Sequence, residues 1–322
     1  MGRNGNSRLA GTTAEVVEAA YRRGREVAAN GRVASYIPEL ARADPAQVGL
    51  ALHELGGSPV LAGDAEQAFT LQSVSKALAL ACVSAAGVDP YERMSAEPSG
   101  DSFHSIVRLE EEHGRPRNPL INAGAIIVSG LLPGATPNDK IGAFLQFLDR
   151  CSGGASYIID DAVYQSERRT GYRNRALAHY MKHFGVLEDP DTAVDTYFRQ
   201  CAVRVTAAQL ARLSLFLAND GTDPLTGEQI LSPDLNRQVL AVMMTCGLYD
   251  EVGRFALEVG LPAKSGVSGG ILAIVPGRCS IASYAPALGP RGNSLAGMQM
   301  LRDLSEAWDL SVFAPVTAGP GG

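Results

Sequence analysis

A chain of 322 residues with 46% hydrophobic and 19% charged residues has the composition of a globular protein and not of a disordered one. Its formal net charge of -6, without any run of Lys and Arg, argues against a nucleic acid as partner. The longest apolar stretch, residues 77–88, is well short of the roughly 20 residues that cross a bilayer, so no membrane helix is expected.

The beginning of the chain and its cysteines indicate the cytoplasm. Residues 1–13 lack the apolar stretch that is typical of a secretory signal. The five cysteines are odd in number and form no C-x-x-C pair. We therefore predict buried thiols in a reducing compartment, not disulfides or metal ligands.

The expected elements begin with a helix over residues 14–29 and two strands over 50–55 and 59–62, joined by a glycine turn. A long helical middle follows, with helical spacing over 73–86, 138–151, 174–184, 206–218 and 232–246. Strand signals return at 270–275 and 279–284. A last helix is expected over 294–308, with Asn293 as its cap.

Strands at both ends of the chain with helices between them predict an α/β (α+β) fold. The sheet lobe is expected from residues 14–72 and 250–313, and the helical lobe from residues 73–249. A cleft between the lobes is the expected site. The tails, residues 1–12 and 314–322, are expected to be flexible.

Lysine is rare in this chain, which contains only four lysines among 28 basic residues. Because Arg does not release its proton and a buried Lys can, a retained Lys points to proton transfer. The segment Ser73-Val74-Ser75-Lys76 forms an S-x-x-K motif at the start of a predicted helix. Its i, i+3 spacing places a hydroxyl and an amine on one helix face, which predicts Ser73 as nucleophile and Lys76 as base.

A second lysine motif, Lys264-Ser265-Gly266, directly precedes a predicted strand. It matches the K-[ST]-G element of penicillin-recognising serine enzymes, and its position downstream of S-x-x-K strengthens both motifs. The competing interpretation of Lys264 is a solvated charge at the end of a strand.

Two other kinds of site are disfavoured. Residues 266–270 fit the G-x-S-x-G nucleophile elbow, but all five histidines precede Ser268, whereas that fold needs a later His. These glycines are expected instead to let two backbones approach around an oxyanion site. His179 and His183 are spaced i, i+4 without H-E-x-x-H, and residues 110–112 form an acidic run on a solvated face, so no metal is expected.

Longer blocks of the sequence resemble the serine-dependent glutaminase family. In chain order they are residues 31–40, 69–76, 118–125, 163–167, 173–178, 247–250 and 264–267. The resemblance extends from about Glu18 to Phe313. It implies a β-lactamase/transpeptidase-like fold, an antiparallel sheet flanked by helices with an inserted helical lobe. It also implies hydrolysis of L-glutamine to L-glutamate and ammonia without a cofactor.

The resemblance also implies roles for single residues. Ser73 would be the nucleophile that forms a γ-glutamyl ester, Lys76 its base and Tyr249 a hydroxyl that relays the proton. The backbone N–H groups of Ser73 and Val267 would form the oxyanion hole. The residues implied in substrate binding are Tyr36, Asn122, Glu167, Asn174, Tyr197, Tyr249 and Val267. A homodimer or homotetramer is implied as well.

Three positions depart from the family pattern: His104 in place of Asn, Val252 in place of Ser and Ser268 in place of Gly. Three alternatives stay open. The chain fits a penicillin-recognising serine hydrolase or peptidase, or a non-catalytic protein that binds an amino acid. The substrate is also open between glutamine, asparagine and another γ-amide, because one methylene is worth only about 1–3 kcal/mol in a pocket.

Overall fold

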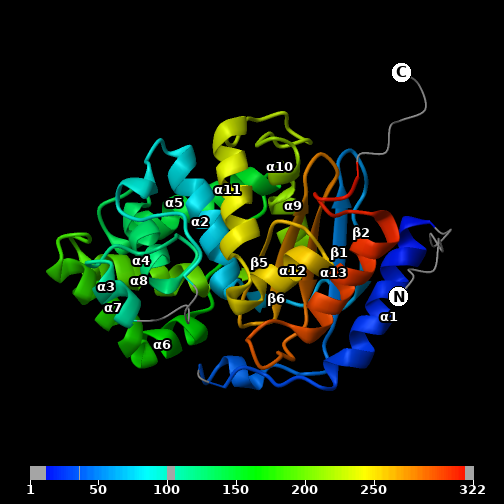
Figure 1. The fold of residues 1–322 in the computed structure, drawn as a ribbon, viewed down its shortest axis with the longest axis horizontal. Coiled ribbons are helices and arrows are strands. Elements are labelled where there is room, and N and C mark those ends of the chain that lie inside the picture. The colour runs from blue at the N-terminus through cyan, green and yellow to red at the C-terminus, as the bar shows by residue number, and fades with distance from the viewer. Residues whose placement is uncertain (1–11, 36, 100–105, 316–322) are drawn as a thin grey trace.

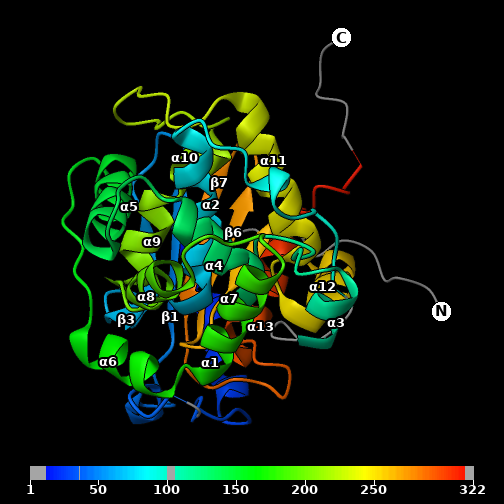
Figure 2. The same cartoon turned by 90° about the vertical axis from the view of Figure 1, so that its left-hand side faces the viewer.

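The fold is known from a computed structural model that describes residues 12–35, 37–99 and 106–315. It combines an antiparallel sheet with a large helical part (Figure 1). Figure 2, turned by 90°, looks onto the helical part in front of the strands. Among the described residues, no helix is both long and apolar enough to cross a bilayer.

The main sheet joins the two ends of the chain, as expected. Its strand order is β2-β1-β7-β6-β5, and all neighbours pair antiparallel. The strands are β1 (Gly49–Glu54), β2 (Val60–Gly63), β5 (Ala263–Ser265), β6 (Gly270–Val275) and β7 (Cys279–Tyr284). All residues of β6 and β7 are buried, because helices cover both faces of the sheet. A second, two-stranded sheet pairs β3 (Phe69–Thr70) with β4 (Arg204–Val205).

One face of the main sheet is covered by α1 (Thr13–Ala28) and α13 (Leu295–Trp308), which pack against each other (Figure 1). The predicted cap of α13 is wrong by one residue. Ser294 caps this helix by accepting a hydrogen bond from the N–H of Gly297. Asn293 is instead buried, and its Oδ1 accepts from the hydroxyl of Ser265 at 2.6 Å, so its side chain is unavailable to the helix.

The helical part is built around α2 (Ser75–Ala85), whose residues 75–84 are all buried. A one-turn 3-10 helix, η2 (Gln72–Val74), precedes it. The other helices of this part are α3 (Ile106–Glu111), α4 (Asn122–Leu131), α5 (Pro137–Ser152), α6 (Asp161–Thr170), α7 (Tyr172–His183), α8 (Pro190–Cys201) and α11 (Pro233–Cys246). Short helices η1 (Leu40–Arg42), η3 (Pro90–Glu92), η4 (Tyr249–Glu251) and α12 (Val252–Glu258) complete the fold.

The helix expected over 206–218 is two helices, α9 (Ala207–Leu213) and α10 (Leu215–Ala218). Between them the hydroxyl of Ser214 donates to the carbonyl of Leu210 and lies 3.0 Å from the hydroxyl of Ser280 on β7. Both helices contact the sheet, on strands β6 and β7 and, for α9, β1. The division into lobes at residues 73 and 249 stays a prediction, since these two helices come from the stretch assigned to the helical lobe.

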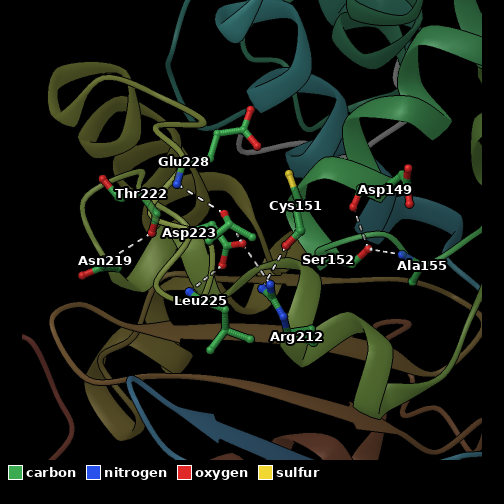
Figure 3. A network of polar contacts seen from close by, with 11 residues as sticks. Asp149, Cys151, Ser152, Ala155, Arg212, Asn219, Thr222, Asp223, Leu225 and Glu228 are labelled. Carbon is green, nitrogen blue, oxygen red and sulfur yellow. Dashed lines mark hydrogen bonds and ion pairs between the residues drawn. The ribbon is translucent and has the colours of Figure 1, made fainter.

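A buried ion pair between Arg212 on α9 and Asp223 connects this helix to the loop after α10 (Figure 3). Nη2 of Arg212 donates to Oδ2 of Asp223 at 2.9 Å, and Nη1 donates to the carbonyl of Cys151 at the end of α5 at 3.0 Å. The hydroxyl of Thr226 also donates to Asp223. The guanidinium group of Arg212, on α9, therefore contacts both the end of α5 and the loop after α10.

The apolar core runs without interruption from the sheet into the helical part. One cluster contains Leu272 and Ala282 on the strands together with Leu78, Phe144 and Phe198 on the helices. A second cluster lies between the sheet and the pair α1 and α13. The sheet and the helices around α2 are therefore parts of one packed unit.

Candidate active site

One cavity of about 400 Å³ collects residues that are far apart in the sequence. Its size lies within the range of sites for small molecules, roughly 300–1,000 Å³. Among the sequence-predicted residues, it is lined by Ser73, Asn122, Glu167, Asn174 and Tyr197. Six further residues complete the described lining: Ile37, Gln72, Thr170, Gly171, Arg173 and Phe198.

Ser73 sits in the one-turn helix η2, with its side chain almost buried. The preceding residue, Gln72, has a φ of 46°, which is uncommon for a residue with a side chain. The N–H of Leu71 donates to the carbonyl of Val203 at 2.8 Å, which anchors the start of this turn. The sequence around Ser73 therefore forms a tight turn, and the α-helix itself begins only at Ser75.

The turn between β5 and β6 passes close to the backbone of Ser73. A Cβ atom on Gly266 would lie 2.9 Å from the carbonyl oxygen of Leu71 and 3.3 Å from the nitrogen of Ser73. The expected close approach of two backbones is thus confirmed at Gly266. This turn joins two strands, so the context of a nucleophile elbow, a strand followed by a helix, is not present at Ser268.

Lys76 is fully buried on the first turn of α2. Its Nζ atom donates to Oδ1 of Asn122 at 2.7 Å and to the carbonyl of Leu120 at 3.3 Å. Within the described part of the chain it makes no hydrogen bond to Ser73. Burial lowers the pKa of Lys76 to about 8, an effect that Cys201 and Glu167 oppose. A fraction of this amine is therefore neutral near pH 7, as proton abstraction requires.

Tyr249 approaches the same region from η4, where its φ is 51°. Its hydroxyl donates to the carbonyl of Ser265 at 3.4 Å. Burial raises the pKa of Tyr249 to about 12, and hydrogen bonding to Ser73 and Ser265 opposes this shift. The phenol is thus a protonated hydroxyl at neutral pH, placed against the hydroxyl of Ser73.

Lys264 lies within β5 and is fully buried, so its interpretation as a solvated strand-end charge is wrong. Its Nζ atom donates to the carbonyls of Gly247 and Ser265 at 2.9 and 2.7 Å. It also lies 4.6 Å from the ring centroid of Tyr249. Burial, and then the charge of Lys76, place the pKa of Lys264 well below its usual value. Lys264 thus binds the backbone just before Tyr249, at Gly247, and the Ser265 carbonyl that also accepts from the Tyr249 hydroxyl.

Glu167 supplies the negative charge of the cavity from the last turns of α6. It is 5% exposed, and its Oε1 accepts a hydrogen bond from Nε2 of Gln72 at 2.7 Å. Burial raises the pKa of Glu167 to about 7, while the hydrogen bond from Gln72 and the charge of Lys76 lower it. A buried carboxylate of this kind favours a cationic ligand group, which would stabilise its charged form.

Two amides form a relay with a fixed direction. Lys76 can only donate, so the atom of Asn122 that faces it is Oδ1. Nδ2 of Asn122 then donates to Oδ1 of Asn174 at 2.9 Å. The Nδ2 group of Asn174 is left as a donor without a partner in the described structure. Asn174 lies inside α7, whose N-cap residue is Gly171. The hydroxyl of Tyr197 also reaches Asn122, at 3.5 Å.

Some sequence-predicted positions fall elsewhere. Tyr36 and His104 lie outside the described residues. Val267 lies beside a second cavity of about 370 Å³, together with Ser268, whose buried hydroxyl has no partner among the described residues. Val252 lines a third cavity of about 300 Å³ next to Tyr249. Among the described residues, no three metal-ligating side chains gather in one place.

Sequence reasoning missed Gln72 and Arg173 as lining residues. Gln72 is adjacent to Ser73, and Arg173 is adjacent to Asn174, so both stood next to predicted residues. This adjacency was the one signal in the sequence that could have placed Gln72 and Arg173 at the site. The contacts of each side chain depend on helices formed elsewhere in the chain.

Comparison with known sequences finds relatives that cover most of this chain. The family model described as "Glutaminase" matches residues 31–313. A curated glutaminase of Rhodopseudomonas palustris is 49% identical over 286 residues, which cover 88% of this chain and 92% of that protein. A glutaminase of Clostridium tetani is 45% identical over 293 residues, covering 90% of this chain and 96% of that protein.

Solved structures give the same result. The Bacillus subtilis glutaminase YbgJ, in covalent complex with 5-oxo-L-norleucine, superposes with a TM-score of 0.85 at 35% identity and covers 94% of this chain and 100% of that chain. A Bacillus glutaminase in 4.3 M NaCl superposes with a TM-score of 0.86 at 37% identity, with 94% and 100% coverage. The fold is the β-lactamase-like α/β fold of these enzymes, and the chain belongs to the glutaminase family.

Proposed function

We propose that the chain hydrolyses L-glutamine to L-glutamate and ammonia through a γ-glutamyl ester on Ser73. The observation that carries this proposal is the shared cavity, in which the candidate nucleophile Ser73 and the carboxylate of Glu167 both lie. Lys76, with a lowered pKa, is buried one helical turn after Ser73. The covalent complex of the Bacillus subtilis relative with 5-oxo-L-norleucine, formed from 6-diazo-5-oxo-L-norleucine, supports the same substrate class.

Substrate binding uses the two ends of the amino acid. Glu167 pairs with the α-ammonium group, since a buried carboxylate gains most from a cation in contact with it. Asn174 donates to the α-carboxylate through its available Nδ2 group, and Tyr197 lines the same part of the cavity. Tyr36, which the resemblance adds to this set, remains part of the proposal. The γ-amide then extends toward Ser73.

Acylation begins when neutral Lys76 accepts the proton of the Ser73 hydroxyl and Oγ attacks the carbonyl carbon (Cδ) of the substrate's γ-amide. The charge that develops on the amide oxygen is stabilised by the backbone N–H groups of Ser73 and Val267. Tyr249, which faces Ser73, passes a proton to the leaving nitrogen, and its own proton is replaced from Lys76. Ammonia leaves and the γ-glutamyl ester remains on Ser73.

Deacylation uses Lys76 as the base a second time. Lys76 accepts a proton from water, and the water oxygen attacks the ester carbon. The oxyanion again lies at the two N–H groups. Ser73 Oγ leaves with the proton that Lys76 returns, and L-glutamate is released. Lys264 takes no part in the transfer, since both of its hydrogen bonds go to backbone carbonyls that hold the Tyr249 segment.

The test is ammonia release from L-glutamine by the wild type and by Ser73→Ala, with Ser84→Ala as a matched control. Ser84 is a buried serine on α2, the helix that follows Ser73, and it does not line the cavity. We expect Ser73→Ala to lower kcat by about 10⁴-fold or more and Ser84→Ala to retain activity. Turnover that survives Ser73→Ala would remove Ser73 as nucleophile. Preferred turnover of asparagine or nitrocefin by the wild type would replace glutamine as the substrate.

We further propose that the protein works in the cytoplasm as a homodimer or homotetramer. The five cysteines are all free and four are buried, which suits a reducing compartment. The assembly is the one that the resemblance to the glutaminase family implies. Light scattering coupled to size-exclusion chromatography measures the assembly. A monomer at enzyme concentrations well above the assay range would contradict the proposed homodimer or homotetramer.

A further inference from the structure

The cavity around Ser73 carries one charge of each sign. Among the described residues that line it, Glu167 and Arg173 are the only charged side chains. A free α-amino acid also carries one charge of each sign, an ammonium and a carboxylate on the same carbon. With Glu167 assigned to the ammonium, the carboxylate is left to face Arg173.

We propose that Arg173 recognises the free α-carboxylate of the substrate and thereby restricts the enzyme to amino acids whose α-carboxyl group is not esterified or amidated. This inference rests on the proposed function and deepens it. Arg173 is a specificity residue and takes no part in proton transfer.

The position of Arg173 relative to Glu167 is fixed by a tight turn. Gly171 ends α6 and begins α7, and its N–H donates to the carbonyl of Glu167 at 2.7 Å. A Cβ atom on Gly171 would lie 2.3 Å from Cζ of Phe198 and 2.6 Å from that carbonyl. The absence of a side chain at Gly171 therefore lets the two helices meet against Phe198, with Glu167 and Arg173 on the same cavity.

Arg173 is a cation of this basic segment whose side chain has no partner among the described residues, and unlike Arg169 it lines the cavity. Arg168 lies 4.0 Å from Asp195, and Arg175 stacks over the ring of Phe198 and donates to the backbone of Arg168. Within the described residues, the side chain of Arg173 makes neither a hydrogen bond nor an ion pair. Its guanidinium group is thus available for a ligand, and its planar donors match the two oxygens of a carboxylate.

Two neighbouring features favour an anion at the same place. Asn174 presents an Nδ2 donor that no described group accepts, because Asn122 occupies its oxygen. The N-terminus of the twelve-residue helix α7 carries no side-chain cap, and its dipole favours negative charge. The guanidinium group of Arg173, the amide of Asn174 and the N-terminus of α7 therefore all favour the α-carboxylate of the substrate.

The experiment compares two substrates that differ only at the α-carboxyl group, L-glutamine and its tert-butyl ester, by release of ammonia from the γ-amide. The variants are Arg173→Met, which keeps a long side chain without charge, and Arg173→Lys. Arg169→Met is the matched control, because Arg169 is an exposed arginine of the same segment that does not line the cavity. Circular dichroism and melting temperature confirm that each variant folds.

We expect Arg173→Met to raise the KM for L-glutamine by about 10- to 100-fold, as for the loss of a charge-assisted hydrogen bond. The KM for the ester changes by less than about threefold, since its neutral group makes no such bond. Arg173→Lys keeps part of the wild-type preference for L-glutamine over the ester. The kcat for L-glutamine changes little in either variant. Arg169→Met leaves the ratio of the two KM values as in the wild type.

An unchanged ratio in Arg173→Met would overturn the inference, as would an equal change in Arg169→Met, which would show only long-range attraction. Both results would leave the proposed function intact, because the wild type still turns over L-glutamine. If the wild type releases no ammonia from L-glutamine, the proposed function fails and this inference fails with it.

Discussion

Asn122 connects Lys76 to Asn174: its Oδ1 accepts from the lysine at 2.7 Å, and its Nδ2 donates to the second amide at 2.9 Å. One side chain thus contacts both the candidate base and the candidate carboxylate-binding residue. Asn122→Asp keeps the shape but places a negative charge beside Lys76, which raises the pKa of the amine. We expect kcat at pH 7.5 to fall about tenfold or more and to recover as pH rises. A pH profile of kcat with the wild-type inflection would contradict this.

The wild-type pH profile should report two groups separately. Lys76 must be neutral to accept a proton, and its pKa is lowered to about 8 by burial, so kcat rises as pH increases through about 8. Glu167 must be ionised to bind an ammonium, and burial raises its pKa to about 7, so KM falls as pH increases through about 7. Steady-state kinetics between pH 5.5 and 9 separate the two. A kcat that is flat across this range would argue against Lys76 as the base.

Gln72 should act on substrate binding more than on chemistry. Its side chain donates to Glu167 at 2.7 Å and thereby lowers the pKa of that carboxyl group. Gln72→Met removes the donor at similar volume, so the pKa of Glu167 rises further. The inflection of KM then moves to higher pH, while the inflection of kcat stays in place. Movement of both inflections together would show that Gln72 positions Ser73 instead.

Loss of the ion pair between Arg212 and Asp223 should lower the free energy of unfolding more than loss of the exposed pair between Arg150 and Glu228. Arg212→Met leaves the fully buried Asp223 without its cation, and we expect a loss of about 3–5 kcal/mol in the free energy of unfolding. The control is Arg150→Met, because the pair of Arg150 with Glu228 is about half exposed and worth about 1 kcal/mol or less. Urea denaturation measures both, and equal losses would contradict the assignment.

The same pair gives a pH dependence with a definite sign. Burial alone would raise the pKa of Asp223, but hydrogen bonds from Arg212, Thr226 and Leu225 outweigh it and leave the pKa below its usual value. A depressed pKa means that the folded state binds the proton less readily than the unfolded state. The contribution of Asp223 is therefore complete above about pH 4 and is lost as pH falls through the folded-state pKa.

Two buried serines in the same turn region should respond in opposite ways to replacement by alanine. Ser265 donates to Asn293 at 2.6 Å, so Ser265→Ala leaves a buried acceptor unpaired and costs about 1–3 kcal/mol of unfolding free energy. Ser268 has no partner among the described residues, so Ser268→Ala removes an unsatisfied hydroxyl and leaves stability equal or slightly higher. Melting temperatures compare the two. A clear loss in Ser268→Ala would show that its hydroxyl is bonded in solution.

Regular elements could be predicted from the sequence where local pattern decides them. The strands at 270–275 and 279–284 have the expected bounds, since the turn residues Pro276 and Gly277 separate two segments rich in strand-forming residues. Strand β5 was missed because it is three residues long and contains Lys264, which is buried only through carbonyls of Gly247 and Ser265. The break at Ser214 was missed because it depends on a contact with Ser280, far along the chain.

The candidate site was predictable in its residue types but not in its geometry. The motif around Ser73 and Lys76 indicated a nucleophile and a base, and the cavity contains the expected Glu167 and Asn174. Nothing in the sequence separates Arg173 from Arg168 or Arg175, since all three are arginines in one short segment. Only the packing of α6 and α7 on Phe198 decides which of them lacks a partner.

The shared apolar cluster also limits how the enzyme can move and how it can be divided. Leu272 on the sheet and Leu78 on α2 belong to one packed interior, so a hinge between the strands and the helices would have to open that interior to water. We therefore expect substrate to enter and leave the cavity through small rearrangements of the residues that line it where α6 and α7 meet. For the same reason, fragments cut at residues 73 and 249 would not survive as separate folded pieces, and slow amide-proton exchange should extend from α2 into β6 as one protected block.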